Sequence, residues 1–480
     1  MSETWALPSS AEPDTPDWWV ARLMPRLAAQ AQRAGVLDSY YRNEYVLPPM
    51  CKAVRDAYRR LMEMARTNFA ELIVEAVRER MQVEGFRTGA DSDPLGDEAA
   101  WALWQDNALD ADADLVHRAK LSMGAAYVIV GLDDAGDVVI TPEDPRQVIT
   151  EADPVRRRKV RAALKVFADD LYGLDRLYLY LPGAVYRATR PSPATSEFED
   201  QTVALSEGGW MWETTVGIVP GGDVPVVPFL NRPDLYNSPQ GEFESHVGHL
   251  ERISYMVLNR LEVATLQAFR QRAVKGVPNT DEHGEPIDYD DIFAADPGAL
   301  WVLPETADLW ESGQVDLSSA LAAVRTDVEM LAAVTRTPMH YLVPTEANQS
   351  AEGASLSHEA LIYKVRDQLR ATGESWEQVM ALGFAFAGDA ERASRADMEI
   401  IWADPERHSL AERADAALKA ASAGMPWQAA MERIWQMTPQ EIARLDAMRL
   451  SDALTAALAA PTPPGAPAAP STPPGAPGGR

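Results

Sequence analysis

Cysteine is almost absent from this sequence, because Cys51 is the one thiol among 480 residues. A single cysteine excludes an internal disulfide framework and a zinc site built from cysteine pairs. Cys51 follows two prolines within an apolar helical pattern, which indicates a buried structural thiol. Cysteine chemistry is therefore not expected to carry the function.

Long apolar runs and export signals are also missing from the sequence. A transmembrane helix needs about 18 or more consecutive apolar residues, and no such run occurs, so we expect no membrane partner. The first residues are acidic and no apolar segment follows them, so we expect no signal peptide. These absences predict a protein that folds in the cytosol.

Lysine is scarce, with seven residues against 37 arginines, and the formal net charge is −28. This balance argues against a conventional nucleic-acid binder, which carries a basic patch. An acidic surface keeps a protein soluble and repels polyanions. Two interpretations remain open: a solubility surface, or a surface past which DNA moves without adhering.

The sequence patterns of common active sites are absent as well. No glycine-rich phosphate loop is followed by a lysine, and neither a His-Glu-x-x-His nor a Gly-x-Ser-x-Gly motif occurs. His246 and His249 lie three residues apart beside Glu242, where surface polar groups are favoured over a metal pair. His340 fits a plain loop histidine better than a titrating switch, and the basic run 156–159 fits a solvated turn better than a phosphate contact. We expect no enzyme activity, no cofactor and no metal.

The dominant feature that is present is a set of long helical patterns between residues 238 and 387. Apolar residues recur at three- and four-residue steps, which places them on one helix face: Val247, Leu250, Ile253, Val257, Leu261, Ala264 and Ala268. This spacing predicts a helix over 238–275, about 50 Å long at 1.5 Å per residue. Further helices are predicted over 317–336 and 356–387, and the polar segment 344–355 precedes the second of them.

The remainder predicts an α+β fold that is mainly helical. Helices over 50–65 and 69–83 precede strand-like alternation between residues 126 and 230, which is typical of an antiparallel sheet. Strand candidates follow at 300–303, 309–310 and 398–402, and helices at 410–423, 426–435 and 439–458. Residues 461–480 consist almost wholly of Pro, Ala, Gly, Ser and Thr, which predicts a disordered tail.

Several stretches in this order resemble the portal proteins of tailed bacteriophages, in the form found in actinobacterial phages. They cover roughly residues 20–440 and comprise 68–81 running into 83–86, 104–110, 124–130, 142–146, 226–232 with the long helix, and 348–354 ahead of the third helix. The resemblance implies a homo-oligomeric ring of twelve subunits at one capsid vertex, through which double-stranded DNA enters and leaves without sequence specificity. It also implies location in the virion, with assembly in the host cytoplasm.

The resemblance implies a division of the chain into the parts of a portal fold. These are a flexible arm (1–15), a wing of helices and antiparallel sheet (16–237), stem helix 1 (238–275), a small α/β clip (276–316), stem helix 2 (317–336), a tunnel loop (337–355), a long helix with the return to the wing (356–437), a helical crown (438–460) and the tail (461–480). The implied partners are the terminase large subunit, a head-completion adaptor, the major capsid protein and the scaffold protein.

Candidate site residues follow from these assignments. The tunnel loop would place five polar residues nearest the DNA: Glu346, Asn348, Gln349, Ser350 and Glu352. The stem helices would pack between subunits through Val257, Leu261, Ala264, Val324 and Val328. The clip would dock its adaptor through Trp301 and Trp310.

A second interpretation stays open at this point. The chain could be a non-portal head–tail connector or a minor capsid scaffold protein, whose long helices only mediate oligomerisation. A ring with a central hole of DNA width separates the two interpretations.

Overall fold

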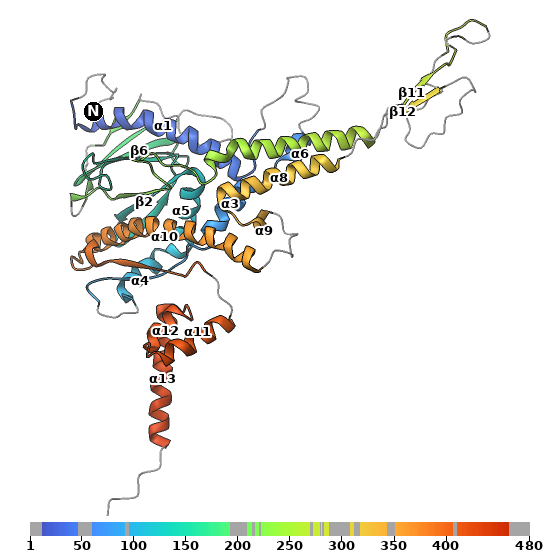
Figure 1. The fold of residues 1–480 in the computed structure, drawn as a ribbon. Coiled ribbons are helices and arrows are strands. Elements are labelled where there is room, and N and C mark those ends of the chain that lie inside the picture. Colours follow the sequence, from blue (N-terminus) through green and yellow to red (C-terminus); the bar gives the residue numbers. More distant parts are fainter. Residues whose placement is uncertain are drawn as a thin grey trace, which may run out of the picture.

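The structure is a computed structural model in which helices and antiparallel sheets combine into a mixed α+β fold, as the sequence predicted (Figure 1). The residues it describes are 12–46, 60–91, 96–192, 209–213, 217–219, 222–268, 272–278, 280, 283–287, 308–311, 317–342, 351–406 and 410–459.

The N-terminal helix α1 (Pro16–Tyr41) packs along a six-stranded antiparallel sheet. Thr15 caps the helix by accepting a hydrogen bond from the Trp18 N–H, and Pro16 occupies the first turn, where a missing donor costs nothing. Trp19, Leu23 and Leu27 are buried against the sheet. Its strands are β4 (Val148–Ala152), β5 (Val160–Asp169), β6 (Leu174–Leu181), β7 (Ala184–Pro191), β8 (Met211–Trp212) and β9 (Gly217–Ile218).

A second sheet has three strands in the order β10–β2–β3 and forms the centre of the body. These strands are β10 (Val226–Leu230), β2 (Ala125–Leu132) and β3 (Val138–Glu143), and they are covered by α4 (Glu98–Asp106), α5 (Leu109–Met123) and α10 (Ala351–Ala387). Trp376 meets Trp104 and Phe229 edge to face, with ring centroids 4.9 and 4.8 Å apart. The Trp376 indole also donates to His117 Nε2 at 2.9 Å. Burial lowers the pKa of His117 to about 3, so this histidine is a neutral structural group.

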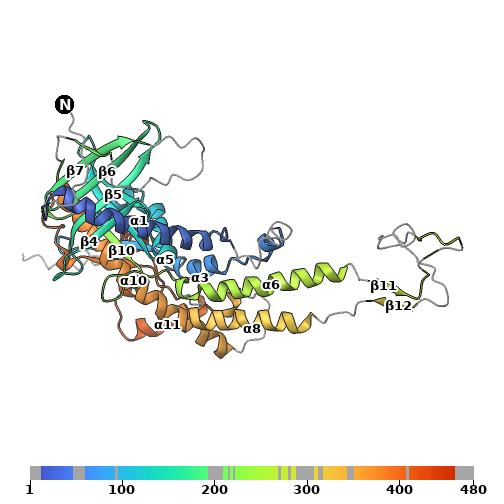
Figure 2. The same cartoon turned by 90° about the horizontal axis from the view of Figure 1, so that it is seen from above.

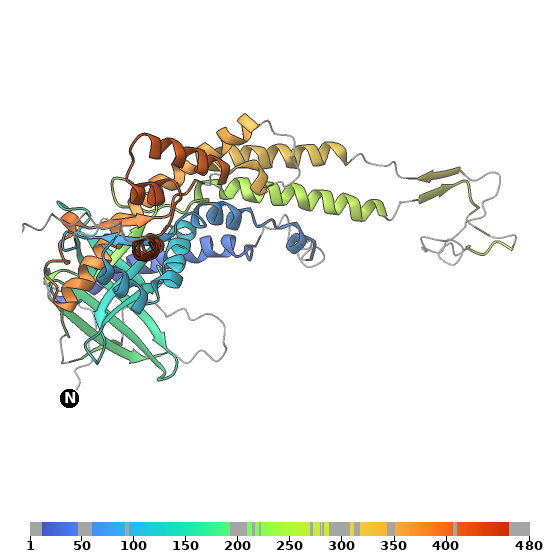
Figure 3. The same ribbon diagram turned by 90° about the horizontal axis from the view of Figure 1, so that it is seen from below.

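Two antiparallel helices project from this body and end in a small β-hairpin. They are α6 (Val247–Ala268) and α8 (Ser318–Thr335), and the hairpin pairs β11 (Arg272–Lys275) with β12 (Asp308–Glu311). Seen from above, the helices run side by side away from the body (Figure 2), and from below the hairpin lies beyond their far ends (Figure 3).

The first long helix is shorter than the predicted 238–275. It starts later because the segment before it forms hydrogen bonds with the end of α5. The Asn231 N–H donates to the Gly124 carbonyl at 2.8 Å and the Glu242 N–H to the Leu121 carbonyl at 2.7 Å. These bonds satisfy carbonyls at the end of α5 that have no partner within that helix. A Cβ on Gly241 would lie 2.7 Å from the Ser122 carbonyl oxygen, so this close contact with the end of α5 requires glycine. A 3₁₀ turn, η2 (Glu244–His246), leads into α6.

Other predicted boundaries were wrong where tertiary pairing overrides the local pattern. Residues 272–275 form β11 instead of the end of the long helix. Helix α3 (Phe69–Arg78) ends before residue 83, because β1 (Val83–Arg87) pairs with β13 (Glu399–Trp402). The predicted loop 337–355 contains α9 (Met339–Leu342), and α10 already begins at Ala351. The predicted strand at 300–303 lies outside the described residues.

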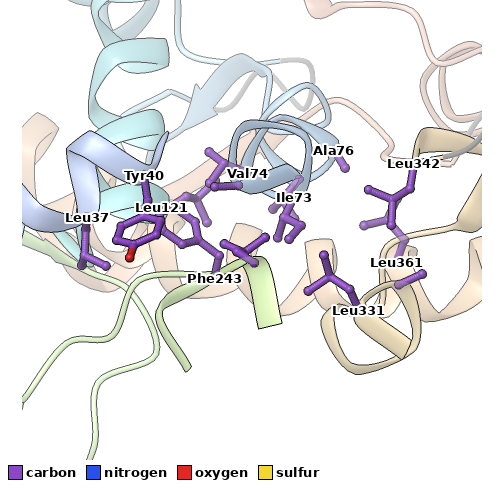
Figure 4. Close-up of a cluster of buried hydrophobic side chains, with 14 of the residues drawn as sticks. Leu37, Tyr40, Ile73, Val74, Ala76, Leu121, Phe243, Leu331, Leu342 and Leu361 are labelled. Carbon is purple, nitrogen blue, oxygen red and sulfur yellow. The ribbon is translucent and has the colours of Figure 1, made fainter. Parts of the chain in front are cut away.

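The base of the projecting helices is buried in one apolar cluster with the body. Leu37 and Tyr40 of α1, residues of α3, Leu121 of α5 and Phe243 meet residues of α6, α8, α9 and α10 (Figure 4). Side chains such as Ile73, Leu331 and Leu361 are fully buried there. The helix pair is therefore anchored at one end and extends freely at the other.

The C-terminal helices form a separate layer below the body in Figure 1. They are α11 (Leu410–Ser422), α12 (Trp427–Arg433) and α13 (Pro439–Ala459), close to the predicted bounds. Arg87 of β1 pairs with Glu432 of α12 and with Glu399. Across the described part of the chain, no helix has the length and apolar character that crossing a membrane requires.

Candidate functional site

The helix pair α6–α8 is held together by an ion pair and a small apolar cluster. Arg252 Nη2 lies 2.8 Å from Asp327 Oδ1. Further out, Val257 and Leu258 are buried against Ala65, with Leu261 and Val324 packed at the edge. These contacts join α6 to α8 within one chain and keep the pair extended.

One side of α8 leaves apolar side chains uncovered. Met330 is 50% exposed and Val334 is 49% exposed, and they lie four residues apart on the same side of the helix. Val328 and Leu331, which point into the chain's own core, are buried. Two exposed apolar side chains on one side of this helix suit contact with a surface outside the chain.

A buried polar network fixes the base of the pair to the body. Lys364 of α10 contacts Glu242 Oε1 at 2.6 Å and donates to the Thr335 carbonyl at 2.8 Å. That carbonyl belongs to the last residue of α8, so the lysine satisfies an acceptor that the helix leaves unpaired. The Glu242 carboxylate is also 3.4 Å from Asn231 Nδ2.

The network continues from Asn231 towards α5. Gln368 donates to Asn231 Oδ1 at 2.7 Å, while the Lys120 ammonium donates to Gln368 Oε1 at 2.7 Å and to Thr372 Oγ1 at 2.6 Å. Burial lowers the pKa of Lys120 to about 7. Burial also lowers the pKa of Lys364, although Glu242 opposes this effect. A network in which each member is hydrogen-bonded makes a stiff joint, because an unpaired group there would cost free energy.

The described residues hold no cluster of three or more His, Cys, Asp or Glu side chains that could bind a metal ion. His246 lies in η2 and His249 in α6, with ring centroids 6.3 Å apart. His340 of α9 instead faces His358 of α10, with ring centroids 4.7 Å apart. Burial and the neighbouring His358 and Arg80 lower the pKa of His340.

Comparison with known proteins decides the family. A family model described as "Phage portal protein, SPP1 Gp6-like" matches residues 21–453. The chain belongs to this phage portal protein family. The resemblance predicted from the sequence is thereby confirmed.

Two curated relatives carry the same description. The portal protein of Mycobacterium phage D29 is 27% identical over 375 residues, which cover 74% of this chain and 72% of that protein. The portal protein of Mycobacterium phage L5 is 27% identical over 401 residues, covering 80% and 76%. Both relatives come from phages of an actinobacterial host.

The predicted inter-subunit residues occupy different environments in this portal protein. Val257 and Val328 are 8% and 4% exposed within a single chain, so they already pack against their own helix partner. Leu261 and Val324 are half-buried and Ala264 is exposed. A role between subunits stays a prediction for all five residues, and Leu261, Ala264 and Val324 have the most surface left for a neighbour.

The predicted channel and docking residues are described only in part. Trp310 lies on β12 and is 52% exposed. Glu352 falls within the first turn of α10, and its side chain is outside the description. Glu346, Asn348, Gln349, Ser350 and Trp301 lie outside the described residues. Their roles stay predictions.

Sequence reasoning missed the uncovered side of α8 and the buried network. The spacing of Met330 and Val334 carried a signal, because residues four apart lie on the same side of a helix. The network carried no such signal, since Lys120, Lys364 and the segment that holds Asn231 and Glu242 are far apart in the sequence. Only the fold brings them together.

Proposed function

We propose that copies of this portal protein form a closed ring and that double-stranded DNA passes through this ring at one vertex of the capsid. The observation that carries the proposal is the helix pair α6–α8, which is anchored in the body and extends to the β11–β12 hairpin. Copies of such a pair, set side by side around an axis, would line a channel. In this arrangement α6 and α8 are the stem, residues 276–316 the clip, the body the wing and α13 the crown.

The proposed ring is a structural conduit that does not itself catalyse a reaction. A chain with net charge −28 and no phosphate-binding loop suits a passive channel, because acidic walls do not retain polyanions. The energy for packaging would then come from a separate terminase bound at the clip. The head-completion adaptor would bind the same end later, and the capsid and scaffold proteins would contact the wing. The ring would belong to the virion after assembly in the host cytoplasm.

Images of the purified protein test this proposal. We expect axial views that show a ring with an open centre wide enough for duplex DNA, and side views that show a narrow end formed by the hairpins. Particles without a central opening would instead support a connector or scaffold protein whose helices serve only to associate. A clip deletion that removes residues 276–316 should keep the ring and remove the narrow end.

A further inference from the structure

A wide basic cleft lies on the body, away from the helix pair. It has a volume of about 1350 Å³ and opens between α1, the β4–β5 turn, residues 233–239 and α10. Seven arginines and four carboxylates line it, and Arg156 and Lys159 line the hollow beside it. In a chain of net charge −28, this is a marked concentration of positive charge.

The cations of the cleft are only partly neutralised within the chain. Glu151 serves three of them, because Arg26 bonds to it and the nearest nitrogens of Arg22 and Arg161 lie 3.7 and 3.5 Å away. Burial favours a raised pKa for Glu151, yet Arg26 and its neighbours hold the pKa below its usual value. Arg33 also pairs with Glu244, Arg395 with Glu374 and Lys159 with Asp223. The cations of the cleft and of the hollow beside it still outnumber these carboxylates and those that line the cleft.

The rim of the cleft presents two apolar side chains on a well-ordered loop. Leu235 is 82% exposed and Tyr236 is 93% exposed. The N–H groups of Tyr236 and Ser238 both donate to Asp234 Oδ1 at 2.8 Å. Arg157 Nη2 donates to the Asp234 carbonyl and to Asn237 Oδ1, each at 3.0 Å. Exposed tyrosine beside arginine is typical of protein–protein contacts, whereas a phosphate backbone gains nothing from an exposed leucine.

The same chain carries an acidic face on the other side of α10. It consists of six aspartates at the α4–α5 junction and the β2–β3 turn: Asp106, Asp110, Asp112, Asp133, Asp134 and Asp137. No lysine or arginine occurs in residues 98–117 or 131–145. The two segments are in contact, and Asn107 Oδ1 accepts a hydrogen bond from the Ile140 N–H at 2.8 Å.

Helix α10 separates the two charged surfaces. Gln378 and Ala385 line the basic side, while Gly383 faces Leu103 of α4 and Val138 of β3. A ring is built from heterologous contacts, in which each subunit uses one surface towards one neighbour and a different surface towards the other. Complementary charge on two sides of one body meets this requirement.

We propose that the arginine cleft of one chain receives the acidic face of the next copy in the ring. The inference rests on the proposed ring and adds which surfaces meet. Leu235 and Tyr236 would supply apolar contact at the edge, and the charges would fix the register and the direction of assembly.

Reciprocal charge reversal tests this pairing. The first variant is Arg156→Glu/Arg158→Glu, which spares Arg157 because it holds the loop 234–238. The second is Asp134→Arg/Asp137→Arg, which spares Asp133 because it caps its own turn. We expect each variant alone to fold with an unchanged melting temperature but to lose ring assembly at least tenfold. An equimolar mixture should form rings again, because reversed clefts then meet reversed faces in alternation.

A matched control reverses two exposed charges outside both surfaces, as Arg42→Glu/Lys419→Glu, and should assemble like wild type. Rings from either single variant, or no rings from the mixture, overturn the proposal. Normal rings of the arginine variant that have lost affinity for duplex DNA also overturn it and assign the cleft to DNA. Wild-type protein that forms no ring contradicts the proposed function itself, so the two failures are distinguishable.

Discussion

At the scale of single residues, charges buried at joints between elements make the fold sensitive to pH. Glu84 of β1 shows this most directly. Burial raises its pKa to about 7, and the nearby carboxylates Glu441, Asp404 and Glu432 add to the effect. The folded protein therefore holds this proton more tightly than the unfolded chain, in which the pKa is ordinary. The stability that the proton confers is present below pH 4.5 and is lost as the pH rises through about 7.

Replacing Glu84 by glutamine should remove this loss of stability at high pH. We expect Glu84→Gln to stabilise the fold at pH 8 by about 1 kcal/mol or less, since the side chain is half-exposed and solvent screens its neighbours. At pH 5 the variant and wild type should differ little. Melting curves at both pH values measure the effect, with exposed Glu359→Gln as the control. Equal melting temperatures of the variant and the wild type at pH 8 would show that the ionised Glu84 side chain does not destabilise the fold.

The ion pair between Lys364 and Glu242, at the base of the helix pair, should affect the free energy of unfolding more than Glu84 does. Lys364→Met leaves the Glu242 carboxylate buried without its ion-pair partner, and we expect a loss of about 3 kcal/mol in the free energy of unfolding, because breaking a buried ion pair is costly. Lys364→Met/Glu242→Gln should recover at least half of that loss. Urea unfolding of all three proteins gives the comparison. A double variant no more stable than Lys364→Met would mean that the loss comes from packing and the Thr335 carbonyl.

At the scale of elements, amphipathic helices were predictable and their junctions were not. The bounds of α8 and α13 match the predictions within one or two residues, because each helix keeps one apolar stripe and ends at a turn signal. The predicted start of α6 was wrong, because the N–H groups of Asn231 and Glu242 donate to carbonyls at the end of α5. Strand β1 was missed for the same kind of reason, since its partner β13 lies more than 300 residues away in the chain.

A charge introduced on the exposed side of α8 and a charge introduced on the packed side of α6 should have different effects on folding and assembly. Met330→Glu with Val334→Glu should prevent ring assembly while leaving the melting temperature of the monomer unchanged, because both side chains are half-exposed in one chain. Leu261→Asp should prevent assembly and also lower the melting temperature, because Leu261 packs against the Val257 cluster. Size-exclusion chromatography and thermal melts on the same samples separate the two outcomes. Intact rings of the Met330/Val334 variant would show that this stripe is not an interface.

At the scale of the whole molecule, the proposed channel should bind DNA weakly along its length. Residues 337–355 contain no lysine or arginine, and added positive charge there would introduce salt-sensitive phosphate contacts. Asn348→Arg/Gln349→Arg should leave the ring intact and slow DNA packaging in vitro, with the defect easing as salt is raised. Asn348→Ala/Gln349→Ala is the uncharged control. Normal packaging by intact arginine-substituted rings at low salt would place this segment away from the DNA.

The particle mass of the purified protein shows whether the proposed ring forms. One chain has a mass of 52.6 kDa, so twelve copies give about 631 kDa. Mass photometry at low salt should show a dominant species at that mass, with the charge-reversed variants shifted to the mass of a single chain. A wild-type protein that remains at 52.6 kDa, or stops at a dimer, under the conditions in which it is folded would contradict the account.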